Sequence, residues 1–255
     1  MTDDVLITTN TGRVRVLTLN RPAARNAFSG ELITRLYEAL VAADTDGSVS
    51  VVVLTGADPA FCAGVVLKEF ARDGSAYLAR FDETDCISHV ARMRTPVIGA
   101  VNGAAFTGGL ELALGCDLLV ASRRAVFADT HVRVGVLPGG GMTARLSRAV
   151  GSARARRMSL TGEVIDADLA LRIGLVTEVV EHSDLIPRVQ QLASAIADVD
   201  RELIVGLKQQ YLEGGDTTLA GALIREREIA GATPIAFERI DQRREEAMIR
   251  NRNQL

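Results

Sequence analysis

The chain begins with apolar and polar residues in alternation. Apolar side chains recur at every second position from Val5 to Thr9 and again from Val14 to Thr18, on either side of a short segment that ends at Gly12. A period of two predicts strands, and a glycine between two such runs predicts a tight turn. We therefore expect a β-hairpin at this end of the chain.

The next residues follow a helical and then a strand pattern. Ser29 precedes apolar residues at helical spacing, so it is predicted to be the N-cap of a helix that runs to about Asp44. A buried strand is predicted at residues 51–54. This β–α–β order implies parallel pairing with a right-handed crossover, and hence an α/β fold.

The same alternation continues and then stops. A helix is predicted at 75–93, a strand at 97–101, a short helix at 108–114 and a strand at 118–121. From about Asp184 the strand pattern disappears, and apolar periodicity with mixed charge predicts helices near 184–197, 200–212, 217–230 and 234–250. In the last two an apolar stripe is a predicted interaction surface: Ile224, Ile229, Ile235, Phe237 and Ile240.

Composition and charge exclude several classes of protein. The chain has 255 residues, of which 47% are apolar and 24% charged, as expected of a packed globular protein. With 29 basic and 32 acidic residues the net charge is −3, so neither nucleic acid nor an anionic membrane surface is an expected partner. The three cysteines have no C-x-x-C spacing, which disfavours a disulfide framework and a zinc site. We expect a soluble, cytoplasmic protein without a transmembrane segment.

Most catalytic signatures are absent from the sequence. There is no G-x-S-x-G elbow, P-loop, G-x-G-x-x-G or H-E-x-x-H motif. The segment Pro138-Gly139-Gly140-Gly141 lacks the lysine of a phosphate loop and is better explained as a glycine turn before a helix. The sequence therefore gives no support for a serine hydrolase, a P-loop nucleotide hydrolase, a Rossmann dehydrogenase or a zinc protease.

Two loops have the character of a ligand site. Residues 61–69 follow a buried strand and are too apolar for an ordinary surface turn, whereas residues 102–111 follow the next strand and open a helix at Gly108 and Gly109. Small residues allow a ligand to approach the backbone, and N–H groups at a helix start face negative charge. Together the loops can offer a pair of N–H donors, which is the requirement for an oxyanion hole.

A set of ordered motifs covers about the first 180 residues. They are Leu19-Asn20-Arg21-Pro22 with Asn26-Ala27, residues 61–69, residues 95–103, residues 108–113, Cys116-Asp117, residues 135–141, Leu160-Thr161-Gly162 and Gly174-Leu175-Val176. No single motif is specific, but their order along the chain is. The ordered set resembles the crotonase, or enoyl-CoA hydratase/isomerase, superfamily.

The resemblance implies a crotonase-like spiral core of stacked β–β–α turns at residues 1–190. It also implies a C-terminal helical oligomerisation region at 191–255 that packs homotrimers, often paired into hexamers. The implied ligand is an acyl-CoA thioester, so that coenzyme A comes with the substrate, and neither a bound cofactor nor a metal is expected.

The resemblance also assigns the binding residues. The N–H groups of Val65 and Gly108 match those that hold the thioester carbonyl. The implied coenzyme A contacts come from the first loop and one arginine: Ala63, Gly64, Leu67, Lys68 and Arg25. Lys68 either contacts a phosphate of coenzyme A or is an ordinary solvated side chain. Val66 stands where many relatives carry aspartate, which implies a more apolar mouth or a neutral packing change.

The acid–base residues match the family only in part. Glu111 corresponds to one of the two glutamates of hydratases that resemble this chain, whereas His131 stands at the position of the second. A histidine relays protons near neutral pH, with Asp129 or Arg133 on the same face if the segment is extended. Alternatively, His131 fills the pocket and Glu111 works alone, as suffices for a double-bond isomerase.

The remaining histidines and cysteines are interpreted as ordinary residues. His89 and His182 lie in a predicted helix and loop, and nothing beside Cys62 or Cys116 would stabilise a thiolate. The sequence thus predicts a trans-2-enoyl-CoA hydratase. Its alternatives are a Δ3,Δ2-enoyl-CoA isomerase that uses Glu111 alone and a catalytically weak acyl-CoA binder.

Overall fold

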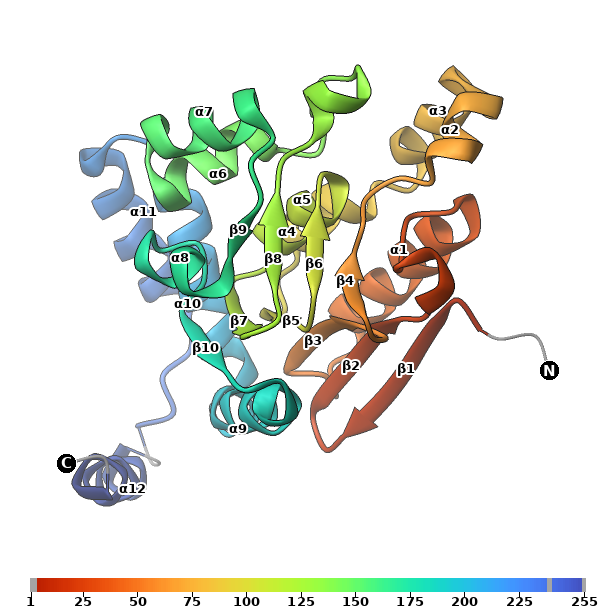
Figure 1. Ribbon diagram of the computed structural model, residues 1–255. Coiled ribbons are helices and arrows are strands. Elements are labelled where there is room, and N and C mark those ends of the chain that lie inside the picture. Colours follow the sequence, from red (N-terminus) through yellow and green to blue (C-terminus); the bar gives the residue numbers. More distant parts are fainter. Residues whose placement is uncertain (1–3, 238–239, 254–255) are drawn as a thin grey trace. The chain divides into compact units, whose positions relative to one another are not determined.

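The computed structural model describes residues 4–237 and 240–253 (Figure 1). The chain divides into two compact units, of which the first ends at Ile204 and the second begins at Val205. The predicted domain boundary at residue 190 lies inside helix α9 (Leu185–Ala197), which belongs wholly to the first unit. In the described part, no helix has the length and apolar character that crossing a membrane requires.

A six-stranded sheet forms the base of the first unit. Its order is β1-β2-β3-β5-β7-β10, and all neighbours are parallel except the predicted hairpin β1–β2, which is antiparallel. Gly12 makes the hairpin turn with a φ of 57°. The strands are β1 (Leu6–Thr11), β2 (Val14–Leu19), β3 (Val51–Gly56), β5 (Val97–Val101), β7 (Leu118–Ser122) and β10 (Glu178–Val180).

A second sheet of short strands, which the hydrophobic pattern did not predict, stands beside the first. Its order is β4-β6-β8-β9, with the first three strands parallel, as Figure 1 shows. The strands β3, β5 and β7 are each followed by a short strand and then by helix, so this part of the chain repeats a β–β–α unit. The short strands are β4 (Ala60–Cys62), β6 (Ala104–Phe106), β8 (Val126–Ala128) and β9 (Ile165–Asp166).

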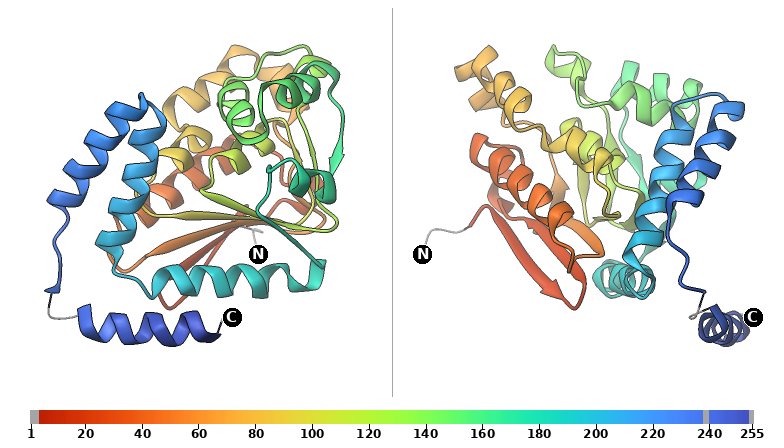
Figure 2. Two further views of the ribbon diagram at one scale, coloured as in Figure 1. Left: turned by 90° about the vertical axis from the view of Figure 1, so that its left-hand side faces the viewer. Right: turned by 180° about the vertical axis from the view of Figure 1, so that it is seen from behind.

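Helices cover both faces of the large sheet. Val52 and Leu54 of β3 pack into one apolar cluster with α1, whereas Val51 and Val53 pack into another with α9. The left view of Figure 2 shows α9 on one side of the sheet and α1 on the other. The helices of this unit are α1 (Gly30–Thr45), α2 (Leu67–Asp73), α3 (Ser75–Glu83), α4 (Cys86–Arg92), α5 (Gly108–Leu114), α6 (Met142–Val150), α7 (Ser152–Thr161), α8 (Ala167–Arg172) and α9.

Helix caps explain one success and one error of the sequence prediction. Ser29 caps α1 as predicted, because its hydroxyl accepts a hydrogen bond from the Leu32 N–H at 3.2 Å. The single helix predicted at 75–93 is wrong: it is two helices, α3 and α4. Asp85 starts α4 by accepting a hydrogen bond from the Ser88 N–H at 2.8 Å, and an N-cap residue leaves the helical conformation.

Among its described residues, the second unit contains helices and no strand. The predicted helices after residue 184 are present as α9, α10 (Arg201–Gly215), α11 (Leu219–Ala232) and α12 (Ile240–Asn253), and α10 begins in the first unit. Within the predicted apolar stripe Ile229 is buried, in contact range of Gly206. The other members are exposed: Ile224, Ile235, Phe237 and Ile240.

Candidate functional site

The predicted site residues follow the carboxyl ends of three neighbouring strands. Val65 lies three residues after β4 ends, Gly108 two residues after β6, and His131 three residues after β8. Because these strands are parallel, their carboxyl ends lie at one edge of the small sheet, the usual position of ligand sites in α/β proteins. All three residues, together with Glu111, line a single cavity of about 610 Å³.

Val65 and Gly108 bring two backbone N–H groups to this cavity. Within the described residues, no acceptor takes a hydrogen bond from either N–H group. Gly64, in the first loop, faces the second loop and has a φ of 89°. A Cβ at this position would lie 3.3 Å from the Gly108 nitrogen. A side chain at Gly64 would therefore be strained and would push the two loops apart.

Thr107 adopts a rare backbone conformation immediately before Gly108. Its φ is 55°, although a β-branched residue strongly disfavours positive φ, and this strain must be balanced by its surroundings. The Thr107 N–H donates to the Ala128 carbonyl at 2.9 Å, and its hydroxyl shares a hydrogen bond with the Thr130 hydroxyl at 2.6 Å. These bonds hold the start of α5 against the segment that carries His131.

Glu111 is buried in the first turn of α5, with a residue exposure of 3%. Its Oε1 atom accepts hydrogen bonds from the N–H groups of Gly140 at 2.8 Å and Met142 at 3.1 Å. Burial raises the pKa of the Glu111 carboxyl, against the opposing effects of His131 and the two backbone donors. The carboxyl is thus suited to carrying a proton.

The glycine segment 138–141 has a function that the sequence did not reveal. It forms the predicted turn before α6, but it also supplies the Gly140 N–H that holds Glu111. A Cβ at Gly140 would lie 2.7 Å from Glu111 Oε2, so only glycine fits. The only sequence signal for this contact was the run of three glycines. The spacing of residues along the chain could not show that one of them approaches the Glu111 side chain.

His131 lies beside Glu111 but not on an extended segment. The condition of an extended segment, under which Asp129 or Arg133 would share its face, is not met, because the residue opens a 3₁₀ turn, His131–Val134. His131 Nδ1 is 2.7 Å from Asp129 Oδ1, and Nε2 is 3.6 Å from Glu111 Oε2. Of the two predicted neighbours only Asp129 meets the ring, whereas the Arg133 guanidinium donates to the Thr161 carbonyl.

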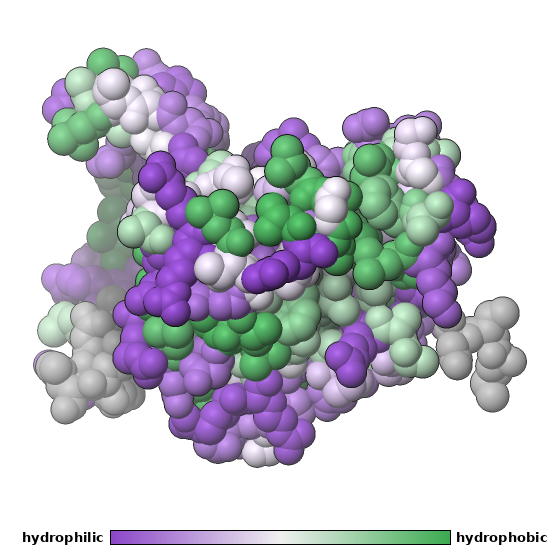
Figure 3. Space-filling view, turned by 45° about the horizontal axis from the view of Figure 1, so that its top comes forward, coloured by the Kyte–Doolittle hydropathy of each residue, from purple (hydrophilic) through white to green (hydrophobic). Residues whose placement is uncertain are grey.

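The rest of the cavity wall is mainly apolar. Its acidic members besides Glu111 are Asp82 and Asp85, and no lysine or arginine is found among the described residues that line it. In Figure 3, with the top of the molecule turned toward the viewer, apolar side chains gather over α2, α3 and the segment after the 3₁₀ turn. The apolar wall consists of Val65, Leu67, Phe70, Leu78, Phe81, Ile87, Val134, Val136 and Leu137.

The residues expected to contact coenzyme A lie in the first loop or next to it, but not all of them line the cavity. Leu67 lines it at the start of α2, and Lys68, next along the helix, is exposed. Arg25 is also exposed, and its carbonyl accepts a hydrogen bond from the Ala63 N–H at 3.0 Å. Its backbone therefore fixes the loop that holds Ala63 and Gly64.

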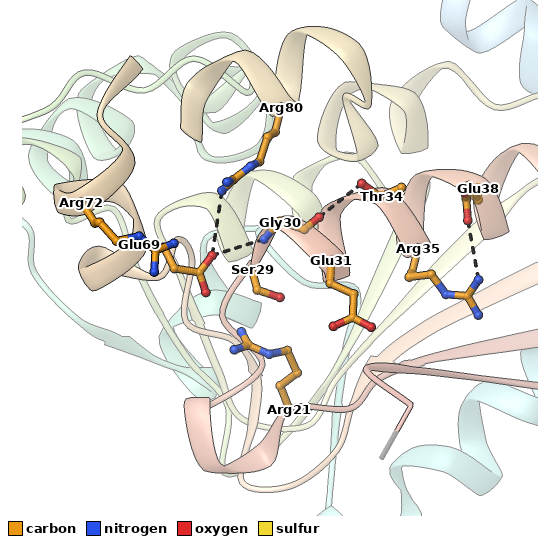
Figure 4. Close-up of a pocket in the computed structure, with 10 residues that line it drawn as sticks. All are labelled: Arg21, Ser29, Gly30, Glu31, Thr34, Arg35, Glu38, Glu69, Arg72 and Arg80. Carbon is orange, nitrogen blue, oxygen red and sulfur yellow. Dashed lines mark hydrogen bonds and ion pairs between the residues drawn. The ribbon is translucent and has the colours of Figure 1, made fainter. Parts of the chain in front are cut away.

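A second hollow, of about 810 Å³, is open and strongly charged (Figure 4). Two of its arginines face glutamates, with Arg35 3.7 Å from Glu38 and Arg80 4.0 Å from Glu69. Glu69 also accepts a hydrogen bond from the Gly30 N–H at the start of α1, where a carboxylate favours the helix dipole. We interpret this hollow as an ion-paired surface that ties α2 and α3 to α1.

The other histidines and the cysteines lie away from the cavity wall. His182 bridges the Ser122 hydroxyl and Asp58 Oδ2, each at 3.0 Å, but Ser122 is fully buried and out of reach of a substrate. His89 packs edge-on against Tyr37. Burial raises the pKa of the Cys62 thiol to about 12, which leaves it protonated at neutral pH.

Comparisons with known proteins agree with this arrangement. A model of the family described as enoyl-CoA hydratase/isomerase matches residues 9–240. The chain is 39% identical to the Arabidopsis thaliana protein named "Probable enoyl-CoA hydratase 1, peroxisomal", over 87% of this chain and 83% of that protein. It is 38% identical to the 2,3-dehydroadipyl-CoA hydratase of Escherichia coli, over 88% of each.

A solved structure extends the likeness to three dimensions. The crystal structure of an enoyl-CoA hydratase from Mycobacterium tuberculosis superposes with a TM-score of 0.74 at 46% sequence identity. The match covers 89% of this chain and 98% of that one.

Proposed function

Because the chain belongs to the enoyl-CoA hydratase/isomerase family, we propose that it adds water across the C2–C3 double bond of a trans-2-enoyl-CoA thioester. The resemblance to the crotonase superfamily and the predicted α/β spiral fold are both confirmed, the fold by its similarity to solved enoyl-CoA hydratases. The observation that carries the proposal is the single cavity lined by Val65, Gly108, Glu111 and His131.

The two N–H groups supply electrostatic stabilisation. A thioester carbonyl placed between the N–H groups of Val65 and Gly108 would receive two hydrogen bonds that shift electron density toward its oxygen. Attack of water at C3 then produces an enolate whose negative oxygen these donors stabilise, an effect typically worth a few kcal/mol per donor. The donors act as an oxyanion hole in this proposal.

The paired side chains supply the proton transfers. Glu111 is the principal acid–base group, and His131 positions the attacking water or exchanges protons with it. Water gives its hydroxyl to C3, and a proton reaches C2, so the product is a 3-hydroxyacyl-CoA. The raised pKa of Glu111 supports its role as the proton donor, because a carboxyl must hold a proton to deliver one.

The walls of the cavity indicate a neutral, apolar acyl chain. Phe70, Phe81 and Leu137 would contact such a chain, whereas Asp82 and Asp85 would repel a carboxylate at its end. The coenzyme A part of the substrate would extend out of the cavity along the first loop. There we assign contacts to the backbone of Ala63 and Leu67, and to the exposed Lys68 and Arg25.

Assembly and compartment are also proposed rather than observed. A homotrimer or a dimer of trimers is supported by the exposed apolar side chains of the second unit, such as Ile224 and Phe237. A cytoplasmic location is supported by the three cysteines, which are all free. No cofactor enters the proposed reaction, since coenzyme A is part of the substrate.

The test is a spectrophotometric assay with two substrate series. We expect purified protein to consume the conjugated-enoyl absorbance of trans-2-enoyl-CoAs with apolar chains. Conversion of 3-enoyl-CoAs to 2-enoyl-CoAs without hydration would instead support an isomerase that uses Glu111 alone. Binding of the esters without turnover of either series would make the protein an acyl-CoA binder and contradict the proposal.

A further inference from the structure

We propose that Asp129 is a positioning residue that holds a neutral His131 ring with its proton on Nδ1, so that the bare Nε2 faces the cavity as the acceptor of the water proton. The inference rests on the proposed hydration. The inference adds two features to the proposed site, a third buried group and a fixed tautomer of His131. Together they assign one direction to each proton transfer.

Asp129 is placed to orient the ring and does little else in the site. The residue is 2% exposed and does not line the cavity. Its Oδ1 atom accepts from His131 twice, from the backbone N–H at 3.2 Å and from Nδ1 at 2.7 Å. A hydrogen bond with Ser159 of α7 also holds this carboxyl.

The ionisation of Asp129 settles which ring nitrogen carries the proton. Burial by itself would raise the pKa of this carboxyl, but the hydrogen bonds from the His131 ring, Ser159 and the His131 N–H outweigh burial and lower it. A carboxylate has no proton to donate, so the nitrogen that meets it must be the donor. In a neutral ring Nε2 is then an acceptor, and it points toward Glu111.

Glu111 is arranged in the complementary way. Its Oε1 accepts two backbone hydrogen bonds, from Gly140 and Met142, so a proton on this carboxyl sits on Oε2. Oε2 and Nε2 are 3.6 Å apart, which is too long for a direct hydrogen bond. The two groups therefore meet reactants rather than each other, one as a proton acceptor and the other as a donor.

The resulting step balances in atoms and charge. His131 Nε2 removes a proton from water as the water oxygen bonds to C3, and the C2–C3 π electrons move to the thioester oxygen as an enolate. The protonated Glu111 then gives its Oε2 proton to C2 as the carbonyl re-forms. Exchange with water, which takes the imidazolium proton from Nε2 and returns a proton to Oε2, restores both residues, and the net change is the addition of one water molecule.

The first test is kinetic and uses Asp129→Asn. The amide of asparagine can donate to Nδ1 and favour the opposite tautomer, with the proton on Nε2. We expect kcat for trans-2-enoyl-CoA hydration to fall about 10²–10⁴-fold, with KM within about threefold. Asp129→Glu, which keeps a carboxylate, should recover part of the activity that Asp129→Asn loses.

The His131→Ala background separates positioning from a structural role. If Asp129 acts through the ring, Asp129→Asn should lower kcat no further in a chain that already has His131→Ala. An equal loss in both backgrounds, or an Asp129→Asn variant with more than a fifth of the wild-type kcat, would overturn the proposal. Thermal unfolding of each variant identifies a loss that comes from misfolding.

The second test is independent of activity. The chain has three histidines, so the ring nitrogens of His131 can be assigned by NMR from the signals lost in His131→Ala. We expect the protonated nitrogen to be Nδ1 in the wild type at neutral pH and Nε2 in Asp129→Asn. A wild-type proton on Nε2 would overturn the inference even if hydration is observed, whereas the predicted tautomer without any hydration would refute only the proposed function.

Charged groups surround the His131 ring and the Glu111 carboxyl. Glu111 of α5 faces Nε2, Asp129 faces Nδ1, and Asp82 and Asp85 line the cavity from α3 and the start of α4. Arg145 of α6 acts on Glu111 and Asp85. Because hydration needs a protonated Oε2 and burial raises the pKa of Glu111, we expect kcat/KM to fall as the pH rises through that pKa, and Asp129→Asn to lower kcat/KM at every pH rather than only to move its profile.

Discussion

Thr107 and Thr130 share a hydrogen bond of 2.6 Å between their hydroxyl groups. Each precedes a residue proposed to act on the substrate, Gly108 in one case and His131 in the other. The bond thus connects the loop proposed to hold the enolate oxygen to the loop proposed to hold the water. It also compensates for the strained backbone of Thr107, whose φ is 55°.

Removing this bond should disturb both loops. We expect Thr130→Val to lower the free energy of unfolding by about 1–2 kcal/mol, because the buried Thr107 hydroxyl loses its partner. We also expect kcat/KM to fall roughly tenfold through misplacement of the site. Urea unfolding and steady-state kinetics measure the two effects. Thr130→Ser, which keeps the hydroxyl, is the control, and equal behaviour of the two variants would contradict this role.

Gly140 and Gly139 are neighbours with different surroundings. A Cβ at Gly140 would lie 2.7 Å from Glu111 Oε2 and 2.8 Å from Ile87 Cγ2, whereas a Cβ at Gly139 meets nothing within 4 Å. We expect Gly140→Ala to lower kcat at least about tenfold by displacing the carboxyl, and Gly139→Ala to leave kcat within about twofold. Loss of activity in both variants would point to the loop as a whole and not to Glu111.

Several features of this fold and site follow directly from the sequence. The alternation around Gly12, the serine cap at Ser29 and the long apolar strands are local signals, and local hydrogen bonding or burial decides them. The residues that the family motifs singled out, Val65, Gly108, Glu111 and His131, line one cavity. Motif order carries this information because the parallel strands bring their ends together.

Other features depend on contacts that spacing does not encode. The small sheet has strands of two or three residues, too short for a periodic pattern. Asp85 interrupts a continuous helical pattern through a single cap, and α2 lies inside what reads as a loop. The backbone donors to Glu111 come from a segment 29 and 31 residues away, so only the folded chain reveals them.

The charge of the acyl chain provides a test of the cavity wall. We expect kcat/KM for trans-2-hexenoyl-CoA to exceed that for 2,3-dehydroadipyl-CoA by about 100-fold or more, since the second adds a carboxylate that would be buried without a cation. Asp82→Asn should reduce this preference about fivefold by removing roughly 1 kcal/mol of repulsion. Equal use of both substrates would show that the chain end lies elsewhere.

Glu111 should weaken the fold at neutral pH. Its pKa is raised above the ordinary value of 4.5, so the folded protein holds this proton more tightly than the unfolded chain does. Stability therefore falls as pH rises through the raised pKa, by about 1.4 kcal/mol for each unit of difference. We expect Glu111→Gln to be more stable than the wild type at pH 7 to 8. The gain should vanish below about pH 4.5, and calorimetry at both pH values measures it.

A pair of glutamates tests most directly whether Glu111 transfers a proton during hydration. Glu111 and Glu31 each lie in the first turn of a helix, but Glu31 is exposed on α1 and does not line the cavity. The measurement is kcat/KM for trans-2-enoyl-CoA hydration by the wild type, Glu111→Gln and Glu31→Gln. We expect a loss of about 10²–10⁴-fold for Glu111→Gln and none for Glu31→Gln. Hydration by Glu111→Gln at the wild-type rate would contradict this role of Glu111.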